Sequence, residues 1–440
     1  MKKRSLFKIF EDFSSKQLSK INSILDTRPA DDSALEDSQD NSTAGRTKEN
    51  GDKSIRLVAA LDVGSSKVTA IIGRLNQMNR IEVLGLGYAV SDGLIRGSVS
   101  NIAKTSAAIK FALAEASQQA NVSVQEVYSS YSGVISNHVE HGVLLRNDSS
   151  TEINRRDIEK LRSEMFNAIL PPGEQLIYMQ AKAYTIDDEP GIKDPVGMSG
   201  KRIEADFQLV TASTTPIEYL QKCCLQANVV LKQIIPAPVA SAEAVICEEE
   251  MEEGIAVVDI GAAVTSVAVY DKGHLIHAEN FPLGGNNISA DIRDFTGLQL
   301  KQAELMKNQF GDLNADGMSV HEIIEAKILS GTKIKQVSRK ALCEVIRSRV
   351  EELISIAYGI VQQAMRNEKL IFGIVFTGGT SVLPNFKELA QEITGEECHL
   401  GVTNLHIAEN MPDVLSKRKE FNAAAHSTAV GLLRVGLLSS

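Results

Sequence analysis

The sequence predicts an α/β protein in which two related domains close on one phosphate-bearing ligand. The first observation is a pair of segments, far apart in the chain, that share one form: a β-rich run, Asp-x-Gly, small residues and a second β-rich run. One segment contains Asp62 and Gly64, and the other contains Asp259 and Gly261. The second observation is a late apolar run, 370–377, that ends in two glycines and opens a helix. Together they indicate a duplicated α/β architecture.

Each Asp-x-Gly segment is interpreted as a β-hairpin whose turn holds an anion. Glycine lets the backbone approach a ligand closely, the N–H groups of the turn can form an anion-binding nest, and the aspartate can hold a hydrated Mg²⁺ ion. A single Asp-Gly turn usually only reverses the chain, so the prediction of an anion site depends on the presence of two such segments. The glycines after the late strand are typical of an ordinary βα turn when taken alone. After two such hairpins they suggest a surface for a base and ribose.

Composition disfavours several classes of function. The 440 residues predict two or more domains with an ample core, and the net charge of −10 argues against general nucleic-acid binding. The five cysteines show no Cys-x-x-Cys spacing, which disfavours a metal cluster or a disulfide framework and indicates a reducing compartment. No apolar run reaches the ~20 residues that span a bilayer, and no secretory signal is evident.

The N-terminal segment differs from the rest of the chain. Residues 1–25 form a predicted amphipathic helix with a Phe-rich apolar side and an excess of basic residues, which is typical of a helix that lies on an anionic membrane surface. The residues expected to contact the membrane are Phe7, Phe10, Phe13, Lys3, Arg4 and Lys8. A helix docked on the body of the protein or on a partner is one alternative. An organelle presequence is another, disfavoured by Glu11 and Asp12.

Residues 26–55 are predicted to be a disordered linker, because they are polar and contain too few large apolar residues to form a core. From residue 56 onward, β-rich runs alternate with helical periodicity. Strands or hairpins are predicted at 57–61, 68–72, 81–86, 127–132, 138–145, 174–183, 202–212, 231–235, 255–270, 274–281 and 370–377. Helices are predicted at 101–120, 153–168, 217–227, 238–249, 286–310, 338–366, 386–394 and 427–438.

The order of the three glycine-containing loops resembles the actin/Hsp70/sugar-kinase superfamily. Four runs narrow the resemblance to the bacterial cell-division family FtsA, and the most specific of them is Pro195 to Gly200 within 191–200. The others are 91–97, 376–380 and 427–433. The resemblance covers about residues 56–440.

This resemblance implies an actin-like (ribonuclease H-like) two-domain ATPase fold with an FtsA-type inserted subdomain. The expected order begins with domain 1 at 56–88, which carries the first phosphate loop, followed by the inserted subdomain at 89–170 and domain 1 again at 171–252. The core of domain 2 is expected at 253–285 with the second phosphate loop, its small subdomain at 286–368, and the rest of its core at 369–440 with the adenosine loop and a closing helix.

The resemblance also implies ATP as ligand, with Mg²⁺ held by Asp62 and Asp259 through water. Carried over by position, the nucleotide-binding residues are Asp62, Gly64, Ser65, Ser66, Lys67, Asp259, Gly261, Gly284, Gly285, Gly378, Gly379 and Thr380. Glu304 and Lys307 resemble a Glu-x-x-Lys pair that lies beside the nucleoside in the superfamily. A solvated ion pair on a helix surface is the alternative for these two residues.

For function, the resemblance implies a septum-forming protein that polymerises head to tail on the cytoplasmic face of the cell membrane at midcell. It would tether filaments of FtsZ there and recruit later division proteins. An actin-like scaffold of a pilus or secretion platform, binding a peptide of a membrane protein, is the alternative. A sugar kinase or an Hsp70-like chaperone is disfavoured, because no catalytic Asp can be placed at a sugar site and no substrate-binding domain follows the body.

The sequence departs from the family in its second phosphate loop. Ala262, Ala263 and Val264 stand where two glycines and a threonine are usual. If the alanines had to adopt positive φ, each would cost roughly 1 kcal/mol, and Val264 cannot offer a hydroxyl to phosphate. We therefore expect altered or weakened nucleotide binding.

Two further departures concern hydrolysis and membrane attachment. Attack on a terminal phosphate needs a side chain that orients water, and Ala237 occupies the place where actin-like ATPases often carry Glu or Gln. This predicts very slow hydrolysis or none. Members of the family usually carry their membrane helix after the body, whereas the basic helix here precedes it, so we expect residues 1–25 to replace that C-terminal helix.

Overall fold

The computed structural model describes residues 56–147, 151–166, 170–316, 318–319, 321–327, 334–366, 369–403, 406–408 and 424–439. The predicted membrane helix at 1–25, with Phe7, Phe10, Phe13, Lys3, Arg4 and Lys8, lies outside these residues, as does the predicted linker at 26–55.

The first sheet has five strands in the order β11-β6-β1-β2-β3. Its strands are β1 (Val58–Val63), β2 (Lys67–Leu75), β3 (Ile81–Val90), β6 (Glu126–Tyr131) and β11 (Val230–Pro236). Strands β1, β2 and β3 form the predicted antiparallel meander, and β6 and β11 add on in parallel. Helix α2 (Ile102–Ala120) packs on β2 and β3, and α4 (Thr214–Gln226) packs on α2.

The second sheet repeats this arrangement. Its order is β14-β13-β12-β17-β18, with an antiparallel meander followed by two parallel strands. The strands are β12 (Ile255–Ile260), β13 (Thr265–Asp271), β14 (His274–Phe281), β17 (Ile374–Thr377) and β18 (Cys398–Leu400). Apolar side chains on both faces of this sheet are buried in hydrophobic clusters, as expected for strands covered on both faces. The duplication predicted from the two Asp-x-Gly segments is therefore present in the fold.

Two helices lie between the sheets, α5 (Ala237–Val245) and α12 (Ser427–Leu438). They touch backbone to backbone, since a Cβ on Gly431 would lie 1.6 Å from the carbonyl oxygen of Ala240. The helix predicted at 238–249 is broken, because Ile246 is extended (φ −125°, ψ 158°) and a separate helix α6 (Glu248–Glu253) follows. The short turn η2 (Ala424–His426) leads into α12.

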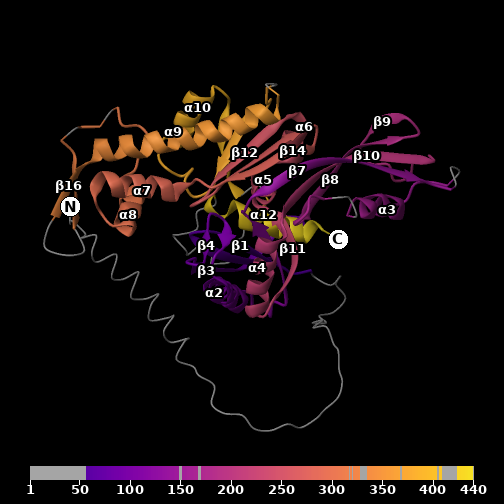
Figure 1. Cartoon of the computed structure of the whole chain (residues 1–440), viewed down its shortest axis with the longest axis horizontal. Helices are drawn as coiled ribbons and strands as arrows, with labels where there is room; N and C mark the ends of the chain where they lie inside the picture. Colours follow the sequence, from indigo (N-terminus) through magenta and orange to yellow (C-terminus); the bar gives the residue numbers. More distant parts are fainter. Residues whose placement is uncertain are drawn as a thin grey trace, which may run out of the picture.

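A third sheet forms an arm on one side of the molecule (Figure 1). Its order is β7-β10-β8-β9, and α3 (Arg155–Phe166) packs on β7. The strands are β7 (Ile135–Leu145), β8 (Glu174–Ile186), β9 (Glu189–Ile192) and β10 (Arg202–Ser213). This arm has a hydrophobic cluster of its own. The separate unit therefore runs over 135–213 and differs from the expected insertion at 89–170. The reason is that α2 packs on the first sheet, whereas β10 pairs with β7 and β8 pairs with β10.

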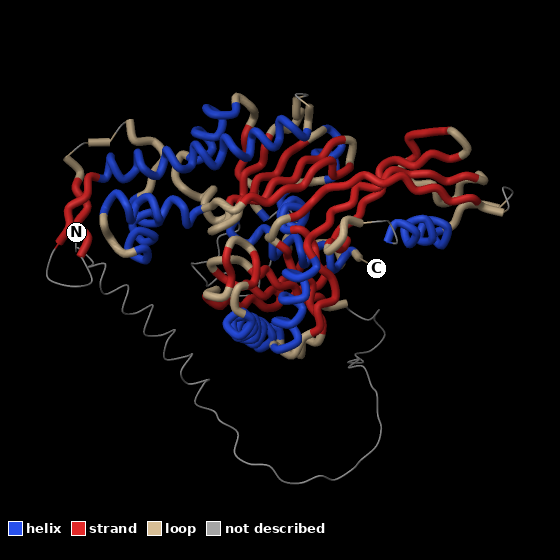
Figure 2. The backbone as a smooth tube through the Cα atoms, in the orientation of Figure 1, coloured by secondary structure: helices blue, strands red, loops and turns tan. Residues whose placement is uncertain are grey.

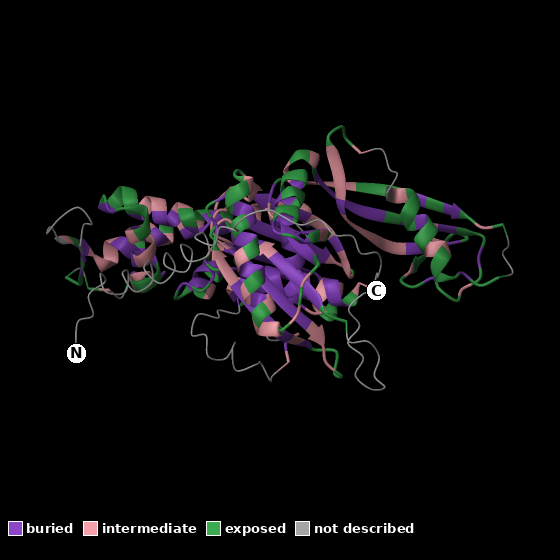
Figure 3. Ribbon diagram, turned by 90° about the horizontal axis from the view of Figure 1, so that it is seen from below, coloured by how far each residue is buried: buried purple, intermediate pink, exposed green. Residues whose placement is uncertain are grey.

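The opposite arm is mainly helical (Figure 2). It contains α7 (Gly285–Thr296), α8 (Leu300–Phe310), β15 (Ile323–Lys327), β16 (Ile334–Ser338) and α9 (Arg339–Ala364). Helix α10 (Phe386–Thr394) packs against α9. The β15–β16 hairpin was not among the elements expected from sequence. Buried residues concentrate in the central body between the arms (Figure 3), which is where the three glycine-containing loops meet. Among the described residues, no helix combines the length and apolar character needed to cross a membrane.

Candidate functional site

The two Asp-x-Gly segments form the same turn. The N–H of Gly64 donates to the carbonyl oxygen of Lys67 at 3.1 Å, and the N–H of Gly261 donates to that of Val264 at 3.0 Å. A Cβ on either glycine would lie 2.9 Å from the same acceptor oxygen. Glycine is therefore needed at both positions for the strand pair to close this tightly.

Asp62, at the end of β1, is the carboxylate of the first turn. The hydroxyl of Ser130, at the end of the neighbouring parallel strand β6, donates to its Oδ1 at 2.9 Å. Burial raises the pKa of Asp62 to about 6, and the negative charge of Asp259 adds to that rise. The Ser130 hydroxyl and the ammonium of Lys67 oppose it. The folded protein thus holds a carboxylate whose charge is incompletely compensated.

Asp259, in β12, is the carboxylate of the second turn and is almost fully buried. Its Oδ2 accepts hydrogen bonds from the hydroxyls of Ser241, Thr428 (3.0 Å) and Ser427 (3.4 Å). Burial raises the pKa of Asp259, while these hydroxyls and Lys67 oppose that rise. Because Ser241 belongs to α5 and the other two to α12, this carboxylate is tied to both helices between the sheets.

Lys67, the first residue of β2, interacts electrostatically with both carboxylates. Burial lowers its pKa, and Asp62 and Asp259 counteract that effect. Its Nζ lies 3.4 Å from Nδ1 of His426. Since an ammonium can only donate, Nδ1 accepts, and Nε2 then carries the hydrogen that points to the Tyr88 hydroxyl 3.0 Å away. Burial lowers the pKa of His426 to about 3, so this imidazole stays neutral.

The third loop follows β17 and touches the second turn. Gly378 has φ +89°, and a Cβ there would lie 2.3 Å from Oδ1 of Asp259, so both its conformation and its surroundings require glycine. The Thr380 N–H donates to the carbonyl oxygen of Ile260 at 3.2 Å. A Cβ on Gly379 would meet nothing within 4 Å, so Gly379 borders open space.

The start of α7 completes this cluster. The Gly285 N–H donates to the carbonyl oxygen of Gly261 at 2.9 Å, and a Cβ on Gly284 would lie 2.6 Å from that oxygen. The Nζ of Lys307, in α8, donates to the Gly285 carbonyl at 3.0 Å and to Glu304 Oε2 at 2.7 Å. Lys307 is only 7% exposed, whereas the Glu304 side chain is partly exposed, so the pair joins a buried ammonium to a carboxylate that solvent reaches.

The nucleotide-binding residues expected from sequence therefore gather around one junction. Ser65 and Ser66 lie in the first turn. Ser65 Oγ accepts a hydrogen bond from the N–H of Gly97 at 3.3 Å, and the carbonyl oxygen of Ser66 accepts one from the N–H of Ser91 at 3.1 Å.

The strain expected in the second turn is absent. The described non-glycine residues with positive φ do not include Ala262 or Ala263, so the turn accommodates both alanines in ordinary backbone conformations. Val264 is buried, 8% exposed, and packs towards Gly97 instead of offering a hydroxyl. The departure from the family therefore changes the chemistry of the turn and not its backbone.

Sequence reasoning missed the hydroxyls that hold the two carboxylates and the histidine beside Lys67. Ser130 could have been found, because it ends a strand that runs parallel to β1 and such strand ends meet at one edge of a sheet. Ser427 and Thr428 begin the run 427–433, but nothing in the neighbouring sequence indicates that their hydroxyls contact Asp259. His426 is separated from Lys67 by 359 positions, and Ser241 meets Asp259, 18 positions later, only because α5 packs beside β12.

The site has the chemistry that a divalent cation and a polyphosphate require. Two carboxylates face one ammonium, which leaves a net negative charge that a hard cation such as Mg²⁺ would neutralise. Within the described part of the chain, no group of three or more His, Cys, Asp or Glu side chains forms a complete metal cage.

Two family models match the chain. Residues 256–431 match the model of cell division protein FtsA, and residues 133–211 match that of the SHS2 domain inserted in FtsA. The cell division protein FtsA of Pseudomonas aeruginosa is 31% identical over 386 residues, 87% of this chain and 89% of that protein. The FtsA of Neisseria meningitidis serogroup B is 33% identical over 343 residues, 77% of this chain and 82% of that protein. The chain belongs to the FtsA family.

Comparison with solved structures agrees on the fold. The type IV pilus biogenesis complex PilM–PilN superposes with a TM-score of 0.59 at 16% identity, over 86% of this chain and 98% of that chain. The fold is thus actin-like, with the inserted domain of the FtsA family. The match to the inserted domain at 133–211 coincides with the third sheet, β7 to β10.

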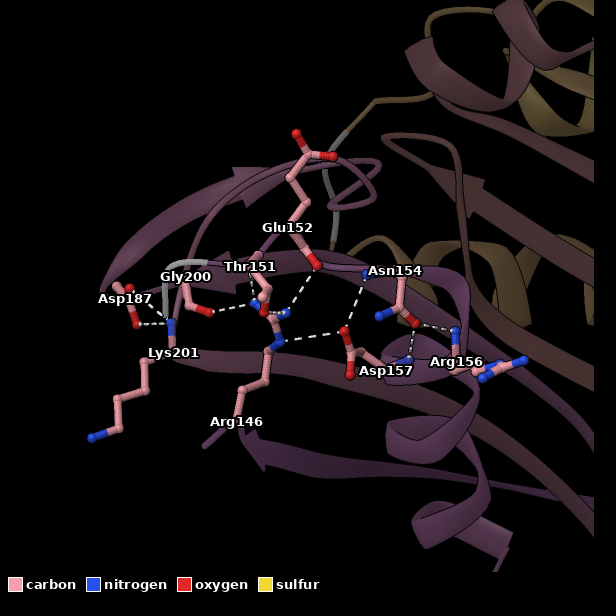
Figure 4. A network of polar contacts seen from close by, with 9 residues as sticks. All are labelled: Arg146, Thr151, Glu152, Asn154, Arg156, Asp157, Asp187, Gly200 and Lys201. Carbon is pink, nitrogen blue, oxygen red and sulfur yellow. Dashed lines mark hydrogen bonds and ion pairs between the residues drawn. The ribbon is translucent and has the colours of Figure 1, made fainter. Parts of the chain in front are cut away.

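The family signature Pro195 to Gly200 has a structural role in this inserted domain. Its backbone pairs with Ile153, whose N–H donates to the Met198 carbonyl at 2.7 Å and whose carbonyl accepts from the Gly197 N–H at 2.8 Å. The buried guanidinium of Arg146 donates to the carbonyl of Gly200 at 2.8 Å. Figure 4 shows this side chain reaching the backbone of Thr151 and Glu152 and the carboxylate of Asp157 as well. The signature thus fixes loops at the far end of the arm.

Proposed function

We propose that this member of the FtsA family binds ATP with Mg²⁺ between its two hairpin turns. It then polymerises head to tail on the cytoplasmic face of the membrane at midcell, tethers FtsZ filaments there and recruits later division proteins. The observation that carries nucleotide binding is the matched pair of turns, each with one carboxylate, around a single lysine. Bound Mg²⁺ would supply charge neutralisation for the phosphates.

The residues divide the work between phosphate and nucleoside. The turns from Gly64 to Lys67 and from Gly261 would present backbone N–H groups to the phosphates, and Asp62 and Asp259 would hold the hydrated cation. The loop from Gly378 and the start of α7 at Gly285 would carry the nucleoside. Their support is the hydrogen-bonded contact of both segments with the second turn.

The proposed turnover of ATP is very slow. Ala237 is buried at the start of α5 and has no group that could orient water. The nucleotide would then act mainly as a structural ligand that favours one arrangement of the two domains. Steady phosphate release by the purified chain, lost in Asp259→Ala, would contradict this part of the proposal.

A pilus or secretion scaffold that binds a membrane-protein peptide is the second candidate, favoured by the overall similarity to the pilus complex. The FtsA relatives, matched at about twice that identity over most of the chain, favour division. Sedimentation of FtsZ polymers with the purified full chain separates the two, because only the division protein retains FtsZ.

Gly378→Ala tests the nucleotide site. The added Cβ would lie 2.3 Å from Asp259 Oδ1 and would force a residue with a side chain into φ +89°, so we expect the affinity for Mg-ATP to fall about tenfold or more. Titration calorimetry measures the affinity. Gly379→Ala is the matched control, because its Cβ meets nothing within 4 Å. Equal affinities of both variants and the unmodified chain would refute the site.

A further inference from the structure

A two-residue hairpin tip lies against both phosphate turns. Strands β4 (Leu94–Ile95) and β5 (Ser98–Val99) pair in antiparallel fashion, with Ile95 opposite Ser98. The connecting residues Arg96 and Gly97 have φ of 50° and 77°. Positive φ at both positions is the requirement of a type I′ turn, which tightly fixes the direction of the hairpin. The position before the glycine is thus held in an uncommon conformation for an arginine.

Gly97 contacts the two turns and a strand end at the same time. Its N–H donates to Ser65 Oγ of the first turn at 3.3 Å. A Cβ on Gly97 would lie 3.1 Å from Cγ2 of Val264 in the second turn and 2.2 Å from the carbonyl oxygen of Ser132. Only glycine allows this approach. The hairpin tip is therefore wedged where the two domains face each other.

The same corner is connected to the second sheet. The carbonyl oxygen of Gly133, which follows Ser132, accepts a hydrogen bond from Nδ2 of Asn280 in β14 at 2.8 Å. Asn280 Oδ1 in turn accepts from the hydroxyl of Ser266 in β13 at 2.7 Å. The tip of the β4–β5 hairpin thus rests on a segment that bridges the domains.

Arg96 stands next to Gly97 in this hairpin tip and carries a positive charge. Its side chain is exposed, and within the described part of the chain no ion pair or hydrogen bond of its guanidinium is present. Guanidinium binds phosphate through two parallel N–H donors. The neighbouring second turn has a buried Val264 where the family usually has a hydroxyl. A cation at the tip would supply a phosphate contact that this turn does not offer.

We propose that Arg96 binds the terminal phosphate of a nucleoside triphosphate, which makes the β4–β5 tip the element that distinguishes triphosphate from diphosphate. The inference rests on the proposed nucleotide binding and adds a specificity-determining residue to it. A diphosphate lacks the group that Arg96 would contact. A triphosphate held by Arg96 would act on the tip where it already contacts the two turns and, through Ser132 and Gly133, on the hydrogen bond to β14.

The test measures the affinity of the full chain for Mg²⁺ with AMP-PNP and with ADP by titration calorimetry. Arg96→Gln removes the charge but keeps a long unbranched side chain at φ 50°. We expect it to bind AMP-PNP about ten- to a hundredfold more weakly and ADP within about twofold of the unmodified chain. Arg96→Lys should recover part of the AMP-PNP affinity. Lys110→Ala, an exposed cation on α2, is the matched control and should change neither affinity.

Each result decides a different question. Equal loss for both nucleotides, or no loss for either in Arg96→Gln, overturns the assignment of Arg96 while nucleotide binding stands. If the unmodified chain binds neither AMP-PNP nor ADP, the proposed function itself fails and the inference fails with it. Unchanged melting temperatures of the variants show that the affinities report on the site and not on folding.

Discussion

The two aspartates of the duplicated motif lie in different surroundings. Asp62 accepts from one hydroxyl, that of Ser130, whereas Asp259 accepts from three hydroxyls on the helices between the sheets. The carboxylate of the first turn is therefore the less stabilised in its charged form, and burial leads the causes that raise its pKa. Asp259 is instead hydrogen-bonded to the two helices that join the domains, so the aspartate of the motif has a different structural role in each domain.

Asp62→Asn is predicted to stabilise the protein at neutral pH in the absence of divalent cations. The pKa of about 6 in the folded state exceeds the ordinary value of 3.8, so the folded protein binds this proton more tightly and stability rises as the pH falls from about 6 towards 4. At pH 7.5 the charged form costs at most about 3 kcal/mol, which Asn avoids.

Thermal unfolding in EDTA checks this prediction. The melting temperature of Asp62→Asn should exceed that of the unmodified chain at pH 7.5, and the difference should shrink towards pH 4. Asp92→Asn, a change at an exposed carboxylate, is the control. The same gain at both pH values would show that the buried charge is not its source.

At the scale of elements, the crossing of α5 and α12 determines how the two domains are joined. Asp259 is hydrogen-bonded to both helices, and the helices approach so closely that Gly431 lies against the backbone of Ala240. Arg434 adds a charged contact from α12 to Glu243 in α5. Nucleotide bound at the second turn, as proposed, would thus act directly on the helix pair that joins the two domains.

Gly431→Ala is predicted to destabilise the protein by about 3 kcal/mol or more, because the new Cβ would lie 1.6 Å from a backbone oxygen that cannot move aside. Gly359→Ala in α9 is the matched control, since a Cβ there meets nothing within 4 Å. That substitution should raise the free energy of unfolding by about 0.5–1 kcal/mol, because alanine favours helix. Denaturant unfolding monitored by circular dichroism measures both, and changes of the same sign would contradict the prediction.

At the scale of the whole molecule, two arms extend from a central body that contains the proposed nucleotide site (Figure 1). One arm is the inserted sheet and the other is built from α7, α8 and α9. The basic segment 1–25 precedes the body in sequence, joined to it by the polar stretch 26–55. This order supports the proposal of a body tethered to the membrane and free to contact FtsZ and its own copies.

Phe7→Glu combined with Phe10→Glu tests the tether. Burial of two Phe side chains in a bilayer surface supplies several kcal/mol, so we expect the variant to bind liposomes with anionic lipids about a hundredfold more weakly. FtsZ should then remain in the supernatant, although it still binds the variant. Co-sedimentation measures both. Leu35→Glu, in the polar stretch, should change neither, and liposome binding that survives the double substitution would refute the tether.

The sequence alone predicted the two hairpins with their Asp-x-Gly turns and the glycine loop after the late strand, and the fold contains all three. These features depend on a few neighbouring residues, because a glycine that closes a tight turn and an aspartate that ends a strand are local requirements. The family resemblance added Gly285 and Lys307, whose burial only the fold revealed.

Tertiary structure decided the features that depend on pairing between distant segments. The inserted sheet joins β7 to β10 across α3 and β8, so its bounds could not be read from local periodicity. The hydroxyls on Asp259 come from Ser241 and Thr428, and Gly97 lies between the two turns only because the β4–β5 hairpin packs there. Such contacts arise from the packing of whole domains, whereas the sequence of each turn and its immediate neighbours is enough to specify the turn.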